Sequence, residues 1–121
     1  MKAKLLAALL LLFVTVFVLI NAAVLTGKLS AYATEVAAVP AGEADTLARA
    51  EDIYRRFRTE EGYISLTVSH DDLSEVRSAF AEWVGAATAG DEVQFTIAKS
   101  RLRDALEQLG RLSGIHAESI L

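Results

Sequence analysis

One uninterrupted stretch of 23 uncharged residues, Leu5 to Gly27, constrains this chain of 121 residues more than any other feature. As a helix it would span about 34 Å, at about 1.5 Å per residue, which is enough to cross the hydrocarbon core of a bilayer. A stretch without a polar face is a poor surface helix for a soluble protein, because it has nothing to present to water. The sequence therefore predicts a membrane segment at residues 5–27.

The charges that flank this segment predict its direction. Lys2, Lys4 and the terminal amine precede it, and a lone Lys28 follows it. Because positive charge is retained on the cytoplasmic side, we expect a single-pass protein of the cell membrane with a cytoplasmic N-terminus. The rest of the chain would then be extracytoplasmic.

A cleaved signal peptide is the rival interpretation. Ala31-Tyr32-Ala33 has the small-x-small pattern of a cleavage site, and a cut there would release a secreted helical protein. Against it, the apolar stretch exceeds the length of about 7 to 15 residues that signal peptides use, and Lys28 would lie in the neutral segment before the cut. We therefore expect an uncleaved signal anchor at residues 1–28, a juxtamembrane helix and hinge at 29–42, and an exported domain at 43–121.

The exported part is acidic and lacks cysteine. From Lys28 to Leu121 there are 10 basic and 16 acidic residues, and the basic cluster Arg55, Arg56 and Arg58 is flanked by acidic residues. This balance disfavours nucleic acid, whose phosphates require clustered positive charge. The absence of cysteine excludes disulfides, thiolate zinc sites and thiol nucleophiles.

Apolar spacing predicts helices throughout the exported part. Leu29 to Val39 could extend the membrane helix until Pro40-Ala41-Gly42 interrupts it, and Glu43 to Arg58 has helical periodicity. Residues 63–68 alternate like a strand, but no second strand-like run exists to pair with them. Continuation of the preceding helix to about Ser69 is therefore the favoured interpretation, with the strand left open.

Two further helices have clear start signals. Ser69 with Asp72, and Asp91 with Gln94, have the spacing of capping boxes. The first helix is expected to end at Gly85, before a flexible turn at 85–90, and the second at about Leu112. The expected fold is all-α, with an N-terminal transmembrane helix and a small antiparallel bundle of about three helices. Phe57, Phe80 and Trp83 fall on apolar stripes and are predicted core aromatics, with an exposed partner-binding role for Trp83 as the alternative.

The most suggestive cluster of polar residues is His70-Asp71-Asp72. A histidine beside two carboxylates could supply metal ligands or an acid–base pair. The chain has only one other histidine, His116, and no pair of histidines at the spacing that metal sites on a helix require. We therefore interpret the trio as the first turn of a helix, whose carboxylates face the free N–H groups.

The stretch Tyr63 to Leu73, with its His70-Asp71-Asp72-Leu73 ending, resembles the bacterial domain of unknown function 4363. Phe57, two following amphipathic helices and the terminal Ile120-Leu121 extend the resemblance over nearly the whole chain, with Ser74 and Ser119 as departures. The resemblance implies a short, mostly helical protein with one N-terminal membrane segment, and implies no activity.

The resulting hypothesis is a non-catalytic membrane-anchored module that binds another protein or itself. No cofactor, metal or small-molecule substrate is expected. The alternatives are the secreted protein released near Ala33 and an envelope metal-binding or hydrolytic protein centred on His70, Asp71 and Asp72.

Overall fold

A computed structural model describes the backbone of residues 1–66 and 68–120, and the side chains of 1–66 and 68–112. These parts form four α-helices and contain no strand. The helices are α1 (Lys2–Ala38), α2 (Thr46–Ile64), α3 (His70–Ala89) and α4 (Glu92–Ile120). The all-α prediction is confirmed.

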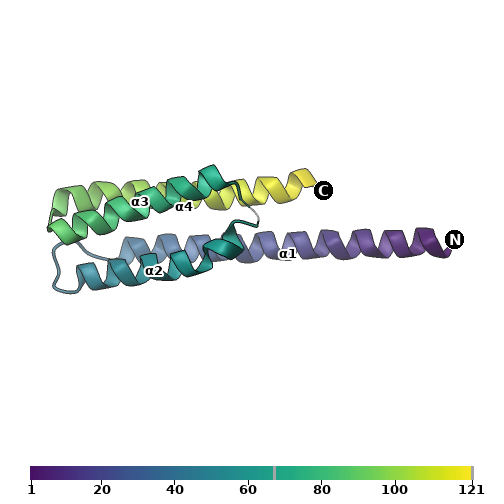
Figure 1. Ribbon diagram of the computed structural model, residues 1–121, viewed down its shortest axis with the longest axis horizontal. Coiled ribbons are helices and arrows are strands. Elements are labelled where there is room, and N and C mark those ends of the chain that lie inside the picture. Colours follow the sequence, from purple (N-terminus) through teal and green to yellow (C-terminus); the bar gives the residue numbers. More distant parts are fainter. Residues whose placement is uncertain (67, 121) are drawn as a thin grey trace.

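Successive helices run in opposite directions, and the N-terminal part of α1 projects alone from one end of the bundle (Figure 1). The expected three-helix bundle lacks one member, because the second half of α1 packs against α4 and completes a four-helix bundle. The buried residues of α1 recur at steps of three and four, with Tyr32 and Ala33 as one adjacent pair. They are Ala22, Leu25, Leu29, Tyr32, Ala33 and Val36. That spacing is the seam pattern of packed helices, and it begins inside the apolar stretch.

The α1–α2 connection is a capped turn. Gly42 has a φ of 77°, which favours glycine, and Thr46 Oγ1 both donates to the Pro40 carbonyl (2.7 Å) and accepts from the Glu43 N–H (3.0 Å). The turn therefore extends to Asp45, and α2 starts at Thr46, later than the predicted Glu43. The Lys99 ammonium on α4 donates to the Val39 carbonyl at the end of α1, where a helix favours positive charge.

The prediction of one helix continuing to Ser69 is wrong, because α2 ends at Ile64 and residues 65 and 66 form a turn. Thr67 lies outside the described residues. The next helix, α3, begins after Ser69. The Ser69 hydroxyl accepts the Asp72 N–H (3.2 Å) and caps α3, as predicted.

The predicted end of α3 at Gly85 is also wrong. The helix continues through the alanine-rich segment to Ala89, and Gly90, with a φ of 69°, ends it in the left-handed conformation. Alanine has the strongest helix propensity, which outweighs the single glycine at 85. Asp91 caps α4 by accepting the Gln94 N–H (3.0 Å), and α4 extends past the predicted Leu112 to Ile120.

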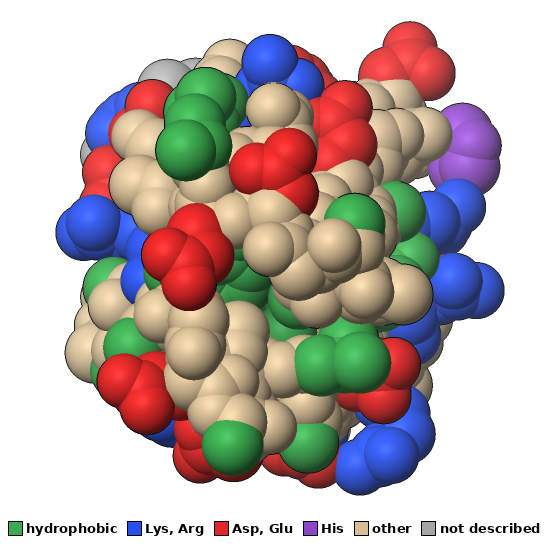
Figure 2. Space-filling view, turned by 90° about the vertical axis from the view of Figure 1, so that its left-hand side faces the viewer, with side chains coloured by type: hydrophobic (Ala, Val, Ile, Leu, Met, Phe, Trp, Pro, Cys, Tyr) green, Lys and Arg blue, Asp and Glu red, His purple; other side chains and the backbone are tan. Residues whose placement is uncertain are grey.

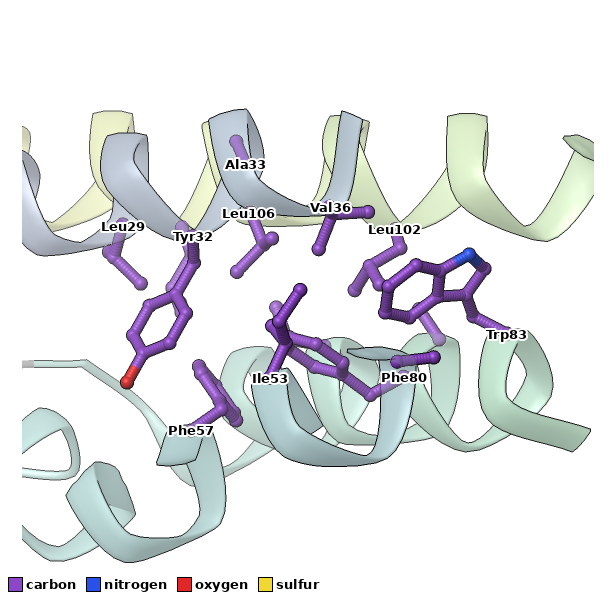
Figure 3. Packing of buried hydrophobic residues seen from close by; sticks show 14 of the residues in the cluster. Leu29, Tyr32, Ala33, Val36, Ile53, Phe57, Phe80, Trp83, Leu102 and Leu106 are labelled. Carbon is purple, nitrogen blue, oxygen red and sulfur yellow. The ribbon is translucent and has the colours of Figure 1, made fainter. Parts of the chain in front are cut away.

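A chain of aromatic rings runs through the core (Figure 3). Ring centroids lie 5.6 Å apart for Tyr32–Phe57, 4.8 Å for Phe57–Phe80, 6.3 Å for Phe80–Trp83 and 5.4 Å for Trp83–Phe95. The chain draws on all four helices, and Phe57, Phe80 and Trp83 are fully buried. These rings therefore connect each helix to the next one along the chain.

Replacing Trp83 with alanine should lower the free energy of unfolding by about 3 to 5 kcal/mol, because the ring leaves a cavity in a close-packed core. Val93→Ala on exposed α4 surface is the control and should change it by less than about 0.5 kcal/mol. Chemical denaturation of the full chain in detergent, followed by circular dichroism, measures both. Equal stability of the two variants would contradict a core role for Trp83.

Gly85 inside α3 and Gly90, which ends it, should respond oppositely to replacement by alanine. A Cβ at either position meets no atom within 4 Å, so only backbone conformation differs. Gly85→Ala should stabilise the protein by about 1 kcal/mol through helix propensity. Gly90→Ala should destabilise it by about 1 to 2 kcal/mol, because its φ is positive. Thermal unfolding of both variants tests the observed helix end. If the helix ended at Gly85, Gly85→Ala would destabilise the protein.

Candidate functional site: a polar ladder beside the membrane segment

The predicted cluster His70, Asp71 and Asp72 opens α3 at the end of the bundle nearest the membrane segment. His70 and Asp71 are exposed, whereas Asp72 Oδ2 accepts a hydrogen bond from the Ser69 hydroxyl (2.6 Å). Among the described residues, no three acidic or histidine side chains converge in a way that could hold a metal ion. The side chain of His116 lies outside that description. The local geometry is that of a helix cap.

The best-organised polar arrangement lies elsewhere, between α1 and α2. We define the polar ladder as seven side chains that pair across this antiparallel interface. They are Asn21, Lys28, Tyr32 and Glu35 on α1, and Arg56, Glu60 and Tyr63 on α2. On each helix they recur at steps of three, four or seven, which places them on one face.

The ladder begins at the level of the apolar segment. The Tyr63 hydroxyl donates to Asn21 Oδ1 over 2.7 Å, and Asn21 Nδ2 donates to the Phe17 carbonyl over 2.9 Å. Lys28 Nζ lies 5.5 Å from the centre of the Tyr63 ring and 3.6 Å from Glu60 Oε2. One lysine therefore contacts both an aromatic face and a carboxylate of the neighbouring helix.

The middle and distal rungs combine packing with charge. Burial, and then the charge of Glu60 beside it, raises the pKa of the Tyr32 phenol above its usual range, so its hydroxyl stays protonated. At the next turns, Arg56 Nη1 donates to Glu35 Oε1 over 3.1 Å, and Arg56 Nε donates to Asp52 Oδ2 over the same distance. The pairing with Glu35 raises the Arg56 pKa. The ladder therefore fixes the position of α2 along the axis of α1.

Sequence reasoning missed this arrangement. It considered Arg56 only as part of a basic cluster flanked by acidic residues, and it gave no role to Asn21. The available signal was the repeat of polar residues at positions 21, 28, 32 and 35, which parallels the buried apolar seam. Its partners could be identified only once α1 was known to continue into the bundle.

Surface hollows also lie away from the ladder. An outer groove of about 760 Å³ runs between α3 and α4, lined by Glu75, Glu82, Ile97, Arg101 and Asp104 among others. Arg101 and Glu82 pair across it at 2.6 Å, and Ile97 is 50% exposed. A distal hollow of about 370 Å³ lies at the opposite end from the membrane segment, where acidic side chains surround apolar ones (Figure 2).

The Asn21–Tyr63 rung should be measurable by a double-mutant cycle. Asn21→Ala, Tyr63→Phe and the double variant should give a coupling energy of about 0.5 to 1.5 kcal/mol in unfolding, the range of a net hydrogen bond. Tyr54→Phe on the same helix is the matched control, because its hydroxyl has no contact with Asn21. Additive effects of Asn21→Ala and Tyr63→Phe would mean that the rung does not form in solution.

Comparison with protein-family models, with curated proteins and with solved structures gave no match. The resemblance of residues 63–73 to the domain of unknown function 4363 therefore stays a prediction. Among the described residues, α1 is the one helix that is long and apolar enough to cross a membrane. The second half of this same helix is buried in the four-helix bundle.

Proposed function

We propose that this chain is a single-pass membrane protein whose extracytoplasmic four-helix domain binds another protein or a second copy of itself. The N-terminus is cytoplasmic, and α1 acts as both the anchor and a structural helix of the domain. The observation that carries the proposal is the continuity of α1 from an exposed apolar part into the buried core.

The first part of α1 requires an apolar environment. Its large side chains between Leu5 and Ile20 are exposed on all sides, and an apolar helix of this kind is stable in lipid and not in water. The charges at Lys2 and Lys4 favour retention of that end in the cytoplasm.

The buried positions of α1 support an uncleaved anchor over a secreted protein. A cut after Ala33 would remove Leu25, Leu29 and Tyr32, which are almost completely buried. Ala33 itself is buried against the bundle, so the cleavage pattern is sequestered once the domain folds. Release at this position would therefore destroy the domain that it releases.

The interaction role is supported by the outer groove between α3 and α4. Ile97 presents half of its surface there, among the charged residues Glu82 and Arg101. An apolar centre with a polar rim is the usual anatomy of a protein interface. By contrast, the alternative of a metal-binding or hydrolytic centre at His70 has only exposed or capping side chains to support it.

Truncation tests the structural part of the proposal. A chain that starts at Asn21 keeps every buried residue of α1 and should unfold cooperatively as a soluble helical protein. A chain that starts at Thr34 loses three large core side chains at about 2 to 5 kcal/mol each, against a total stability of about 5 to 15 kcal/mol, and should be unfolded. Circular dichroism of the two chains shows whether each is folded. A folded chain that starts at Thr34 would restore the secreted alternative.

Proximity labelling in the native envelope, with a tag at the C-terminus, tests location and interaction together. The intact mass of the tagged protein in the membrane fraction should correspond to the full-length chain. Ile97→Glu should remove the dominant labelled neighbour, because it places a charge at the centre of the outer groove. Ala81→Glu, at an exposed position of α3 outside the groove, should leave it unchanged. Equal labelling in both variants would exclude the groove as the working surface.

A further inference from the structure

We propose that the turn between α2 and α3, with the exposed Leu66, lies in the outer interfacial layer of the same bilayer that α1 crosses. This inference rests on the proposed membrane anchorage and goes further, because it assigns a second, lipid-contacting surface to the exported domain. The surface consists of Tyr63, Ser65, Leu66 and Val68.

The first step is the position of the membrane boundary along α1. Residues up to Ile20 have their surfaces exposed or half-buried, whereas Ala22 and Leu25 are buried under the bundle. From Lys2 to Asn21 the helix rises about 28 Å, close to the hydrocarbon thickness of about 30 Å. The lipid-facing part therefore ends near Asn21, and the last residues of the apolar stretch serve the core of the domain.

The second step is the position of the turn relative to that boundary. The hydrogen bond from the Tyr63 hydroxyl to Asn21 Oδ1 holds the end of α2 at the level of Asn21. Leu66 follows within one turn of chain, and its N–H donates to the Tyr63 carbonyl over 3.2 Å. The boundary residue of α1 and the turn are thus held at the same level by direct bonds.

The third step is the chemistry of the surface. Leu66 is 82% exposed, the largest value for a large apolar side chain that follows α1 in the described part of the chain. Tyr63 is half-buried and amphipathic, which is typical of side chains at a membrane interface. A second element reaches the same region, since α4 packs its Gly110 on Leu29 and continues antiparallel to α1 past the turn (Figure 1).

The charged residues near the turn indicate which region of the lipid this surface contacts. Asp71 and Asp72 follow the turn at the start of α3, and Glu61 is already paired with Arg77 by two bonds of 2.9 Å. The turn itself contains no lysine or arginine, and Lys28, which lies over the Tyr63 ring, is paired with Glu60 at 3.6 Å. Contact is therefore apolar, with the interfacial acyl and glycerol region, and should not depend on anionic lipid or salt.

The absence of cysteine allows a direct test in the full-length chain. Single variants Leu66→Cys, Leu12→Cys and Val93→Cys are labelled with an environment-sensitive fluorophore and reconstituted in phosphatidylcholine vesicles. All three side chains are at least half exposed, so labelling leaves the core intact. Position 12 reports the membrane interior, and position 93 is an exposed apolar control on the distal part of α4. Ser65→Cys gives a second, independent reading of the turn.

The labels at 66 and 65 should show a blue-shifted emission relative to 93, quenching by a shallow spin-labelled lipid and loss of quenching by aqueous iodide. Emission and iodide quenching at 66 equal to those at 93, with 12 still in lipid, would overturn the inference and leave the anchor intact. A shielded label at 66 that the spin-labelled lipid does not quench would indicate a second protein copy and also overturn it. A water-exposed label at 12 would instead refute the membrane anchorage itself.

Discussion

The structure depends on one helix, α1, whose exposed apolar first part continues without a break into a face that is buried in the bundle. The apolar seam of α1 begins at Ala22, inside the stretch that composition alone assigns to the membrane, and continues to Val36. Before that point, side chains point outward in all directions. After it, Leu25, Leu29 and Tyr32 turn inward against α2 and α4. Without this face, the remaining three helices would leave one side of the aromatic core uncovered.

The polar ladder fixes the register of α2 along α1, which the apolar seam does not. Apolar contacts tolerate sliding of one helix along another, whereas the bonds of Tyr63 with Asn21 and of Arg56 with Glu35 are made at one height only. Individually such exposed or half-buried pairs contribute little free energy. Together they fix the position of the bundle relative to the exposed apolar part of α1.

Much of the architecture follows from the sequence because it depends on local signals. The caps at Ser69 and Asp91 use side-chain oxygens within one turn, so a short pattern suffices to locate them. The end of α3 at Gly90 required a comparison of alanine propensity with one interior glycine, and the sequence pattern pointed to the wrong glycine. The continuation of α1 into the core was hidden for a different reason. Hydropathy cannot distinguish an apolar face that meets lipid from one that meets protein, and the partners of Asn21 and Lys28 are more than 30 residues away in the chain.

The unbroken course of α1 has a consequence for the reach of the domain. From Asn21 to Val39 the helix rises about 27 Å as one rigid rod, so a bilayer crossed by its first part, as we propose, would hold the domain at a fixed distance. No hinge within α1 allows the bundle to bend away, since the first break in the helix comes at its far end, beside Pro40. With α1 across a bilayer, as we propose, the outer groove would face sideways, parallel to the membrane plane. A protein that uses this groove would then have to approach beside the lipid, which a membrane protein with a short ectodomain does more readily than a freely diffusing one.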